Sequence, residues 1–260
     1  MEVVITDFND SSIHKKALLC AKLCYLAYHI DDNIHLKDEM GIKTCLIQKI
    51  ADLKYKSIQY HIYESHTHQF LIIRGTDTKA GVFEAISDLL VSLNLKPSIN
   101  GLGCYSHNGY SDVGNKVISQ LCKKKLLDTN KQLVVAGHSL GGAIAKYISI
   151  HIDRSIELFT FGSPQVTSKE YYVYKHSIVE SHYCNPCDWI CSYPSTLYND
   201  DKYVYHLKRN GDIKINKIKR LGIFIPLTYM SIRMLIGNRK LFNDHAIKTY
   251  VTNLEKYLEN

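Results

Sequence analysis

The sequence predicts an α/β protein in which a mainly parallel central sheet is covered by helices on both faces. Short apolar runs typical of buried strands alternate with longer segments whose apolar residues recur at helical spacing. Between one such strand and the helix after it lies a glycine-flanked serine turn. The 260 residues contain no internal repeat, low-complexity tract or linker. We therefore expect residues 1–260 to form a single domain.

The N-terminal half is expected to contain helices around a pair of strands. Residues 11–28 carry apolar residues at the spacing of an amphipathic helix. Residues 54–63 and 69–74 are typical of a strand pair joined by a polar stretch. Helical spacing returns at residues 81–93 and 110–125.

The C-terminal half alternates strands and helices more regularly. A short apolar run at residues 133–136 predicts a buried strand, and residues 143–151 predict the helix that follows it. Further strands and a closing helix are expected at residues 157–161, 178–183, 203–207 and 244–258.

The turn between that strand and helix has the sequence Gly-His-Ser-Leu-Gly-Gly. A G-x-S-x-G turn in this setting is a nucleophile elbow, which exposes the hydroxyl of its serine, here Ser139. Gly137 and Gly141 let the strand and helix backbones approach closely, and we expect the His138 side chain to face away from Ser139. The helix N-terminus directs N–H groups at a developing oxyanion, and the N–H of Leu140 supplies one donor.

A serine nucleophile needs a general base and an acid that orients the base, and on this type of turn the chain order is serine, acid, histidine. His245 follows Asn-Asp at the start of the closing helix and is the expected base, whereas the alternative His206 lies within a strand. Asp188 follows the strand that ends near residue 183, where the acid is expected. The remaining histidines and aspartates downstream of Ser139 lie at positions less suitable for the base or the acid: His151, His176, His182, Asp153, Asp200, Asp201 and Asp212.

The eight cysteines and the charge pattern predict neither a metal site nor a bound cofactor. Cys184 and Cys187 form a lone C-x-x-C without the further ligands that zinc requires, so we expect buried, reduced thiols at the end of a strand. The alternative is a processed secreted protein, in which the clustered cysteines, Cys191 included, could pair. His61, His66 and His68 are expected on a half-exposed hairpin. The N-terminus has no signal-peptide pattern, so we expect a cytoplasmic protein.

The net charge of +7 is concentrated between residues 208 and 240. No nucleic-acid-binding module accompanies it, so we expect no nucleic acid as a partner. The apolar stretch at residues 221–236 is too short and too charged to span a membrane. This region is either a solvated basic face beside a core segment or a peripheral contact with an anionic lipid surface.

Six blocks in order resemble the class 3 lipases, the fungal-type triacylglycerol lipases with the α/β-hydrolase fold. Together they cover residues 70 to 250. Departures from the family pattern occur at Gln165 and Thr167 and in the missing proline after Asp188, and they affect the expected loop shapes. The blocks are Ile72-Ile73-Arg74-Gly75-Thr76, Ser106-His107-Asn108-Gly109-Tyr110, the turn at residues 137–142, Phe159-Thr160-Phe161-Gly162-Ser163-Pro164, Asn185-Pro186-Cys187-Asp188, and Asp244-His245 with Tyr250.

The resemblance implies hydrolysis of lipid esters, of the triacylglycerol lipase or phospholipase A1 type, through Ser139, Asp188 and His245. It also implies an oxyanion hole made by Thr76 with Leu140, and a lid at residues 79–93. Two alternatives remain. One is a carboxylesterase or thioesterase for soluble substrates on the same fold. The other is a catalytically silent scaffold, whose expected signature, a broken triad, is absent from the sequence.

Overall fold

A computed structural model of the chain places eight strands in one sheet. In sheet order they are β1 (Lys43–Ile50), β2 (Ile58–Glu64), β3 (His68–Arg74), β6 (Gln132–His138), β7 (Ile156–Phe161), β8 (Ile178–Cys184), β9 (Tyr203–Leu207) and β10 (Ile213–Lys217). The five strands from β3 to β9 run parallel to one another, and β1, β2 and β10 pair antiparallel at the two sides.

The structure describes only part of the chain, and several predicted features lie outside that part. Thr76, the predicted lid at residues 79–93 and the apolar stretch at residues 221–236 are among them. The described residues are 8, 11–29, 43–50, 58–75, 97–99, 105–165, 177–192, 203–217 and 243–260.

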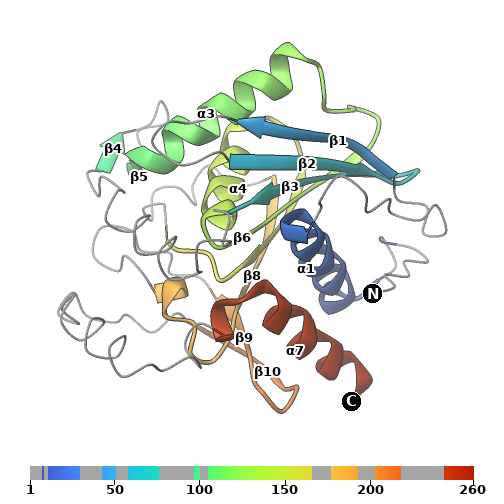
Figure 1. The fold of residues 1–260 in the computed structure, drawn as a ribbon, viewed down its shortest axis with the longest axis vertical. Coiled ribbons are helices and arrows are strands. Elements are labelled where there is room, and N and C mark those ends of the chain that lie inside the picture. Colours follow the sequence, from blue (N-terminus) through green and yellow to red (C-terminus); the bar gives the residue numbers. More distant parts are fainter. Residues whose placement is uncertain are drawn as a thin grey trace.

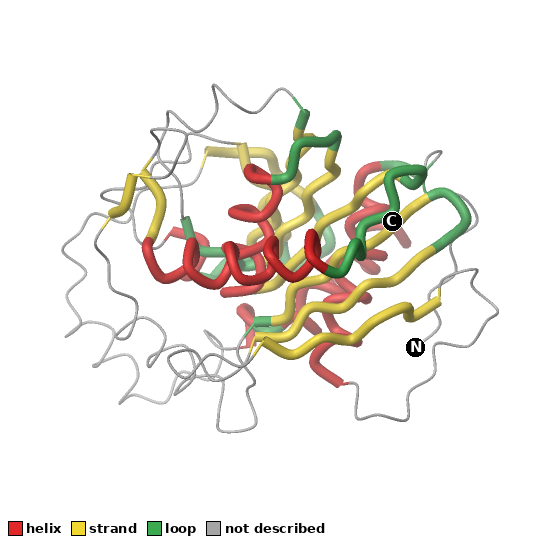
Figure 2. Tube along the Cα trace, turned by 90° about the horizontal axis from the view of Figure 1, so that it is seen from above, coloured by secondary structure: helices red, strands yellow, loops and turns green. Residues whose placement is uncertain are grey.

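Helices cover both faces of the sheet. Helix α1 (Ile13–His29) and helix α7 (Ile247–Glu259) pack on one face around an apolar core that includes Phe70, Phe159 and Phe161. Helix α3 (Asn108–Lys123) and helix α4 (Leu140–His151) pack on the other face. Figure 1 shows the two pairs of helices, and Figure 2 shows the strands lying side by side between them.

The predicted α/β fold class is confirmed, with small shifts at the ends of the elements. All four predicted helices that fall within the described residues are present, and so are the six predicted strands. The sequence missed β1 and β10, which are the first and last strands of the sheet, and the small two-stranded sheet of β4 (Pro97–Ile99) and β5 (Tyr105–His107). Among the described helices, none is long and apolar enough to cross a membrane.

The half-exposed hairpin predicted around His61 and His68 is wrong for these two residues. Their exposed fractions are 1% and 0%, because neighbouring strands flank β2 and β3 on both sides and helices cover the sheet. His66, at the turn between the two strands, is exposed as expected. Burial lowers the pKa of His61 to about 4, so this imidazole is neutral at physiological pH.

Candidate active site

The predicted nucleophile and acid lie at the carboxyl ends of two parallel strands, and the predicted base lies just before a helix. Ser139 directly follows β6, and Asp188 lies in the loop that follows β8. His245 lies two residues before α7, which packs on the sheet near α1. Parallel strands bring their carboxyl ends to one edge of a sheet, which is where ligand sites of α/β folds form.

Ser139 sits in a strained backbone conformation between β6 and α4. Its φ of 56° lies in the left-handed region, which side chains other than glycine rarely adopt. Although Ser139 occupies the N-cap position of α4, its side chain makes no capping hydrogen bond. The strand and helix predicted on either side of this turn are both present.

Two glycines permit the tight turn around Ser139. A Cβ atom at Gly137 would lie 2.3 Å from the carbonyl oxygen of Gly141. A Cβ atom at Gly141 would lie 2.1 Å from the carbonyl oxygen of Ile73 in β3. Both distances are below any normal contact, so the close approach of β3, β6 and α4 requires glycine at these positions.

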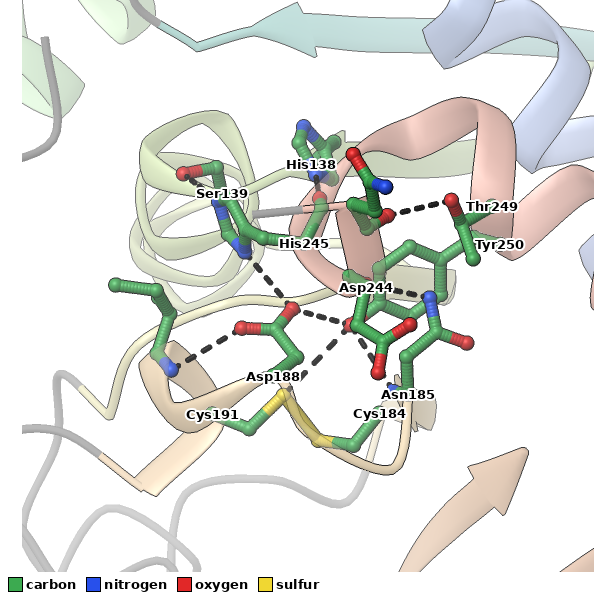
Figure 3. A network of polar contacts seen from close by, with 12 residues as sticks. His138, Ser139, Cys184, Asn185, Asp188, Cys191, Asp244, His245, Thr249 and Tyr250 are labelled. Atoms are coloured by element: carbon green, nitrogen blue, oxygen red, sulfur yellow. Dashed lines mark hydrogen bonds and ion pairs between the residues drawn. A yellow bond between two sulfur atoms is a disulfide. The ribbon is translucent and has the colours of Figure 1, made fainter. Parts of the chain in front are cut away.

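His245 connects the serine to the aspartate (Figure 3). The hydroxyl of Ser139 donates to Nε2 of His245 over 2.9 Å, and Nδ1 of His245 donates to Oδ2 of Asp188 over 2.8 Å. All three side chains are buried, with exposed fractions between 2% and 8%. The geometry is that of a nucleophile, a base and an acid that fixes the tautomer of the base.

Asp188 is held by three donors. Besides His245, the hydroxyl of Tyr250 donates to Oδ2 over 2.5 Å, and the backbone N–H of Ile190 donates to Oδ1 over 3.1 Å. Burial and the charge of Asp188 raise the pKa of Tyr250 well above its ordinary value, so the phenol stays protonated as a donor. These bonds fix the carboxylate in the orientation that faces His245.

Asn185 ties the loop of Asp188 to the segment that carries His245. Its side-chain amide donates to the backbone carbonyl of Asp244 over 2.7 Å, and its carbonyl oxygen accepts from the side chain of Asn253 over 2.8 Å. Asn185 appears in the sequence as the first residue of the N-x-x-D block, but this clamping role was not inferred from the sequence. In the sequence, only the fixed spacing to Asp188 marked Asn185 as a residue of the site.

The predicted oxyanion donors are only partly described. Leu140 is the first residue of α4, so its backbone N–H lies at the helix N-terminus directly after Ser139. Thr76 lies outside the described residues. The residue before it, Gly75, lies against the first turn of α4, where a Cβ added to it would be 3.5 Å from the backbone nitrogen of Gly141.

The histidines that competed with His245 are bonded elsewhere. His151 contacts the carbonyl of Tyr147 on its own helix, and His182 contacts Thr160 within the sheet. His206 lies in β9, opposite Cys184 of β8. His138 directs its ring to Tyr28 and to the backbone of His245. His176 lies outside the described residues.

The expectation of reduced cysteines at the end of β8 is wrong for one pair. Cys184 is joined to Cys191 in a disulfide, while Cys187 of the predicted C-x-x-C is exposed and is not part of this disulfide. Disulfides persist mainly in oxidising compartments, so this pair does not fit the expected cytoplasmic setting. The Nε2 atom of His182 lies 3.3 Å from the sulfur of Cys184, but the two bonded sulfurs are not thiolates and so are not available to a metal ion.

Breaking this disulfide is expected to destabilise the protein, since the bridge closes the loop that holds Asp188. Closure of so short a loop contributes about 2.5 kcal/mol. A Cys184→Ala/Cys191→Ala variant should therefore melt at a lower temperature than the wild type, and a dithiol reductant should lower the Tm of the wild type alone. Thermal unfolding measures both effects, with Cys122→Ser as the control for a free, exposed cysteine. Equal melting of wild type and double variant would contradict the expectation.

Gly162, the residue after β7, is expected to tolerate no side chain. Its φ is 57°, and a Cβ atom there would lie 2.5 Å from Oδ2 of Asp188 and 3.1 Å from Nδ1 of His245. Gly162→Ala should therefore displace the bonded pair and lower kcat by about 100-fold, the cost of a misplacement near 1 Å. Gly211→Ala is the matched control, because Gly211 has a φ of 90° but lies in the turn between β9 and β10. Equal kcat in the two variants would contradict the prediction.

Comparison with known proteins finds similarity to lipases. The family model described as Lipase (class 3) matches residues 70–197, a span that includes Ser139 and Asp188. The toxin TseL of Vibrio cholerae serotype O1 is 30% identical over 134 residues, which are 50% of this chain and 21% of that protein. The matched region therefore spans about a fifth of the length of this curated relative.

Solved lipase structures share the fold. The Rhizomucor miehei lipase propeptide complex matches with a TM-score of 0.62 and 17% identity, over 83% of this chain and 78% of that chain. Lipase II from Rhizopus niveus matches with a TM-score of 0.64 and 16% identity, over 82% of this chain and 90% of that chain. The chain therefore has the α/β-hydrolase fold of these enzymes.

Proposed function

Because this chain belongs to the class 3 lipase family, we propose that it hydrolyses the carboxylic ester bonds of lipids with Ser139 as the nucleophile. The observation that supports this most directly is the continuous hydrogen-bonded path from Ser139 through His245 to Asp188. The strained turn at Ser139 and the burial of all three side chains support it further.

In the proposed reaction the Ser139 oxygen attacks the ester carbonyl while Nε2 of His245 accepts the hydroxyl proton. His245 then donates this proton to the leaving alcohol, and an acyl-enzyme forms at Ser139. In the second half of the cycle His245 accepts a proton from water as the water oxygen attacks the acyl group. His245 then returns this proton to the Ser139 oxygen as the bond between this oxygen and the acyl carbon breaks and the fatty acid leaves. Asp188 stabilises the imidazolium that forms in each half.

We propose that the negative charge on the carbonyl oxygen is stabilised by backbone N–H groups of Leu140 and Thr76. Leu140 follows the nucleophile at a helix N-terminus, where N–H groups and a partial positive charge are available. Each such donor is worth roughly 3 kcal/mol of transition-state stabilisation. The proposal for Thr76 rests on the sequence resemblance and on the position of its neighbour Gly75 against α4.

The substrate class is proposed as lipid, either triacylglycerol or the sn-1 ester of a phospholipid. A substrate panel tests this: p-nitrophenyl esters of several chain lengths, triolein emulsions, and phosphatidylcholine vesicles with and without phosphatidylserine at low and high salt. We expect turnover of triolein or phospholipid that rises above the solubility limit of the substrate. Phosphatidylserine should increase it at low salt if the basic C-terminal third contacts the lipid surface. Turnover of soluble short-chain esters alone would favour the esterase alternative.

A further inference from the structure

We propose that Tyr28 and His138 are positioning residues. One chain of hydrogen bonds through their side chains connects His245, the proposed base, to Gly75 at the end of β3, just before Thr76 of the proposed oxyanion hole. This inference rests on the proposed function of Ser139 and His245, and it assigns a role to two side chains that do not themselves react. The chain of hydrogen bonds joins three parts of the fold that are far apart in the sequence: helix α1, the end of β6 and the segment before α7.

The donors and acceptors of this chain can be assigned from chemistry. Nε2 of His138 lies 2.6 Å from the backbone carbonyl oxygen of His245, which can only accept, so Nε2 carries a hydrogen. The ring of His138 is neutral, because burial and the nearby His245 lower its pKa well below the ordinary value. Its Nδ1 is therefore an acceptor, and the hydroxyl of Tyr28 donates to it over 3.2 Å.

The chain continues from Tyr28 to the end of β3. The backbone N–H of Gly75 donates to the Tyr28 oxygen over 3.1 Å, so this hydroxyl accepts from Gly75 while it donates to His138. Gly75 immediately precedes Thr76 in the chain. A Cβ atom at Gly75 would lie 2.6 Å from the Tyr28 oxygen, so the phenol and the strand end are in close contact.

The surroundings of His138 favour its neutral form. The groups that face it are Tyr28 of α1, His245 before α7 and Tyr250 of α7, with ring centroids 5.7, 4.9 and 6.0 Å from that of His138. Arg74 of β3 lies over the Tyr28 ring, 5.4 Å from its centroid, and adds positive charge to this region. A charged His138 would therefore oppose the imidazolium that forms on His245 during the reaction.

As a result, the side chain and the backbone of His245 are held by two different residues. Asp188 holds the ring of His245 through Nδ1, and His138 holds its backbone through the carbonyl oxygen. Tyr28 keeps His138 in the tautomer that can donate to this carbonyl. Loss of Tyr28 leaves a lone pair on Nδ1 of His138 without this donor, which favours protonation of the ring.

The test compares Tyr28→Phe with Tyr25→Phe, which removes the hydroxyl from a ring that stacks on His29 of the same helix. The readouts are kcat per active site titrated with a fluorophosphonate, KM for a p-nitrophenyl ester, and the pH profile. We expect kcat of Tyr28→Phe to fall about tenfold, the loss of roughly one hydrogen bond in the transition state, with KM unchanged. The acid limb of its pH profile should move to higher pH, because removal of the Tyr28 donor favours the protonated ring of His138.

Two variants of His138 separate the two bonds. Glutamine places an amide near Nε2 and can still donate to the carbonyl of His245, whereas asparagine reaches only the position of Nδ1. We expect His138→Gln to retain a higher kcat than His138→Asn. The proposed role of this hydrogen-bond chain is overturned if Tyr28→Phe has the same kcat per titrated site and the same pH profile as Tyr25→Phe, even if the Tm of Tyr28→Phe is lower. An inactive wild type would instead overturn the proposed function.

Discussion

Ser139→Ala is expected to abolish both ester hydrolysis and labelling by a fluorophosphonate. The hydroxyl of Ser139 is the only proposed nucleophile, and it lies 2.9 Å from the base. Because members of a triad act as a unit, loss of the nucleophile typically lowers kcat by about 10⁴- to 10⁶-fold. The fold should persist, since alanine fits the space of serine and makes no new demand on the strained φ of this residue.

The matched control for this variant is Ser149→Ala. Ser149 is a buried serine on the same helix, and its hydroxyl donates to the carbonyl of Ala145 rather than to a histidine. We expect this control to keep full labelling and at least most of its activity. Undiminished labelling of Ser139→Ala would show that another group is acylated and would remove the nucleophile from the proposal.

The central part of the fold could be predicted because its signals are local. The strands that became β6 and β7 are short apolar runs buried on both faces, and α4 follows a glycine-rich turn. The edge strand β1 was missed for a physical reason. Its sequence, Lys-Thr-Cys-Leu-Ile-Gln-Lys-Ile, lacks both a continuous apolar run and a regular alternation. Its strand state depends on pairing with β2, which the sequence does not reveal locally.

The site was predictable to the extent that its residues follow chain order and strand ends. Ser139, Asp188 and His245 each occupy a loop after a strand or before a helix, and the structure brings the three together. Contacts between distant segments left no such signal. The bond between Tyr28 and His138 joins residues 110 positions apart, and nothing in the helix spacing of residues 11–28 marks one tyrosine as different from another.

The disulfide shows a similar limit of prediction from the sequence. The sequence drew attention to Cys184 and Cys187, because a C-x-x-C pair is a familiar spacing. Partner choice, however, depends on where the loop places its side chains. The short 3-10 helix η4 (Trp189–Ser192) turns the chain back, so that Cys191 meets the end of β8 with a Cα–Cα distance of 6.3 Å. Cys187 lies at the exposed tip of the loop between them.

His245→Ala is expected to reduce kcat about as strongly as loss of the nucleophile, whereas His206→Ala should leave kcat nearly unchanged. In the proposed mechanism His245 accepts the hydroxyl proton of Ser139, whose oxygen lies 2.9 Å from its Nε2. His206 lies in β9 and pairs with Cys184 across the sheet, so its loss should affect stability more than catalysis.

Asp188→Asn provides the second arm of this test. Asparagine replaces one of the two accepting oxygens with an NH2 group, so it cannot accept from His245, Tyr250 and Ile190 together, and the base can adopt the wrong tautomer. We expect a fall in kcat of about 10⁴-fold with little change in KM. The kcat values of p-nitrophenyl ester hydrolysis measure these effects. Loss of activity in His206→Ala with full activity in His245→Ala would transfer the role of base to β9.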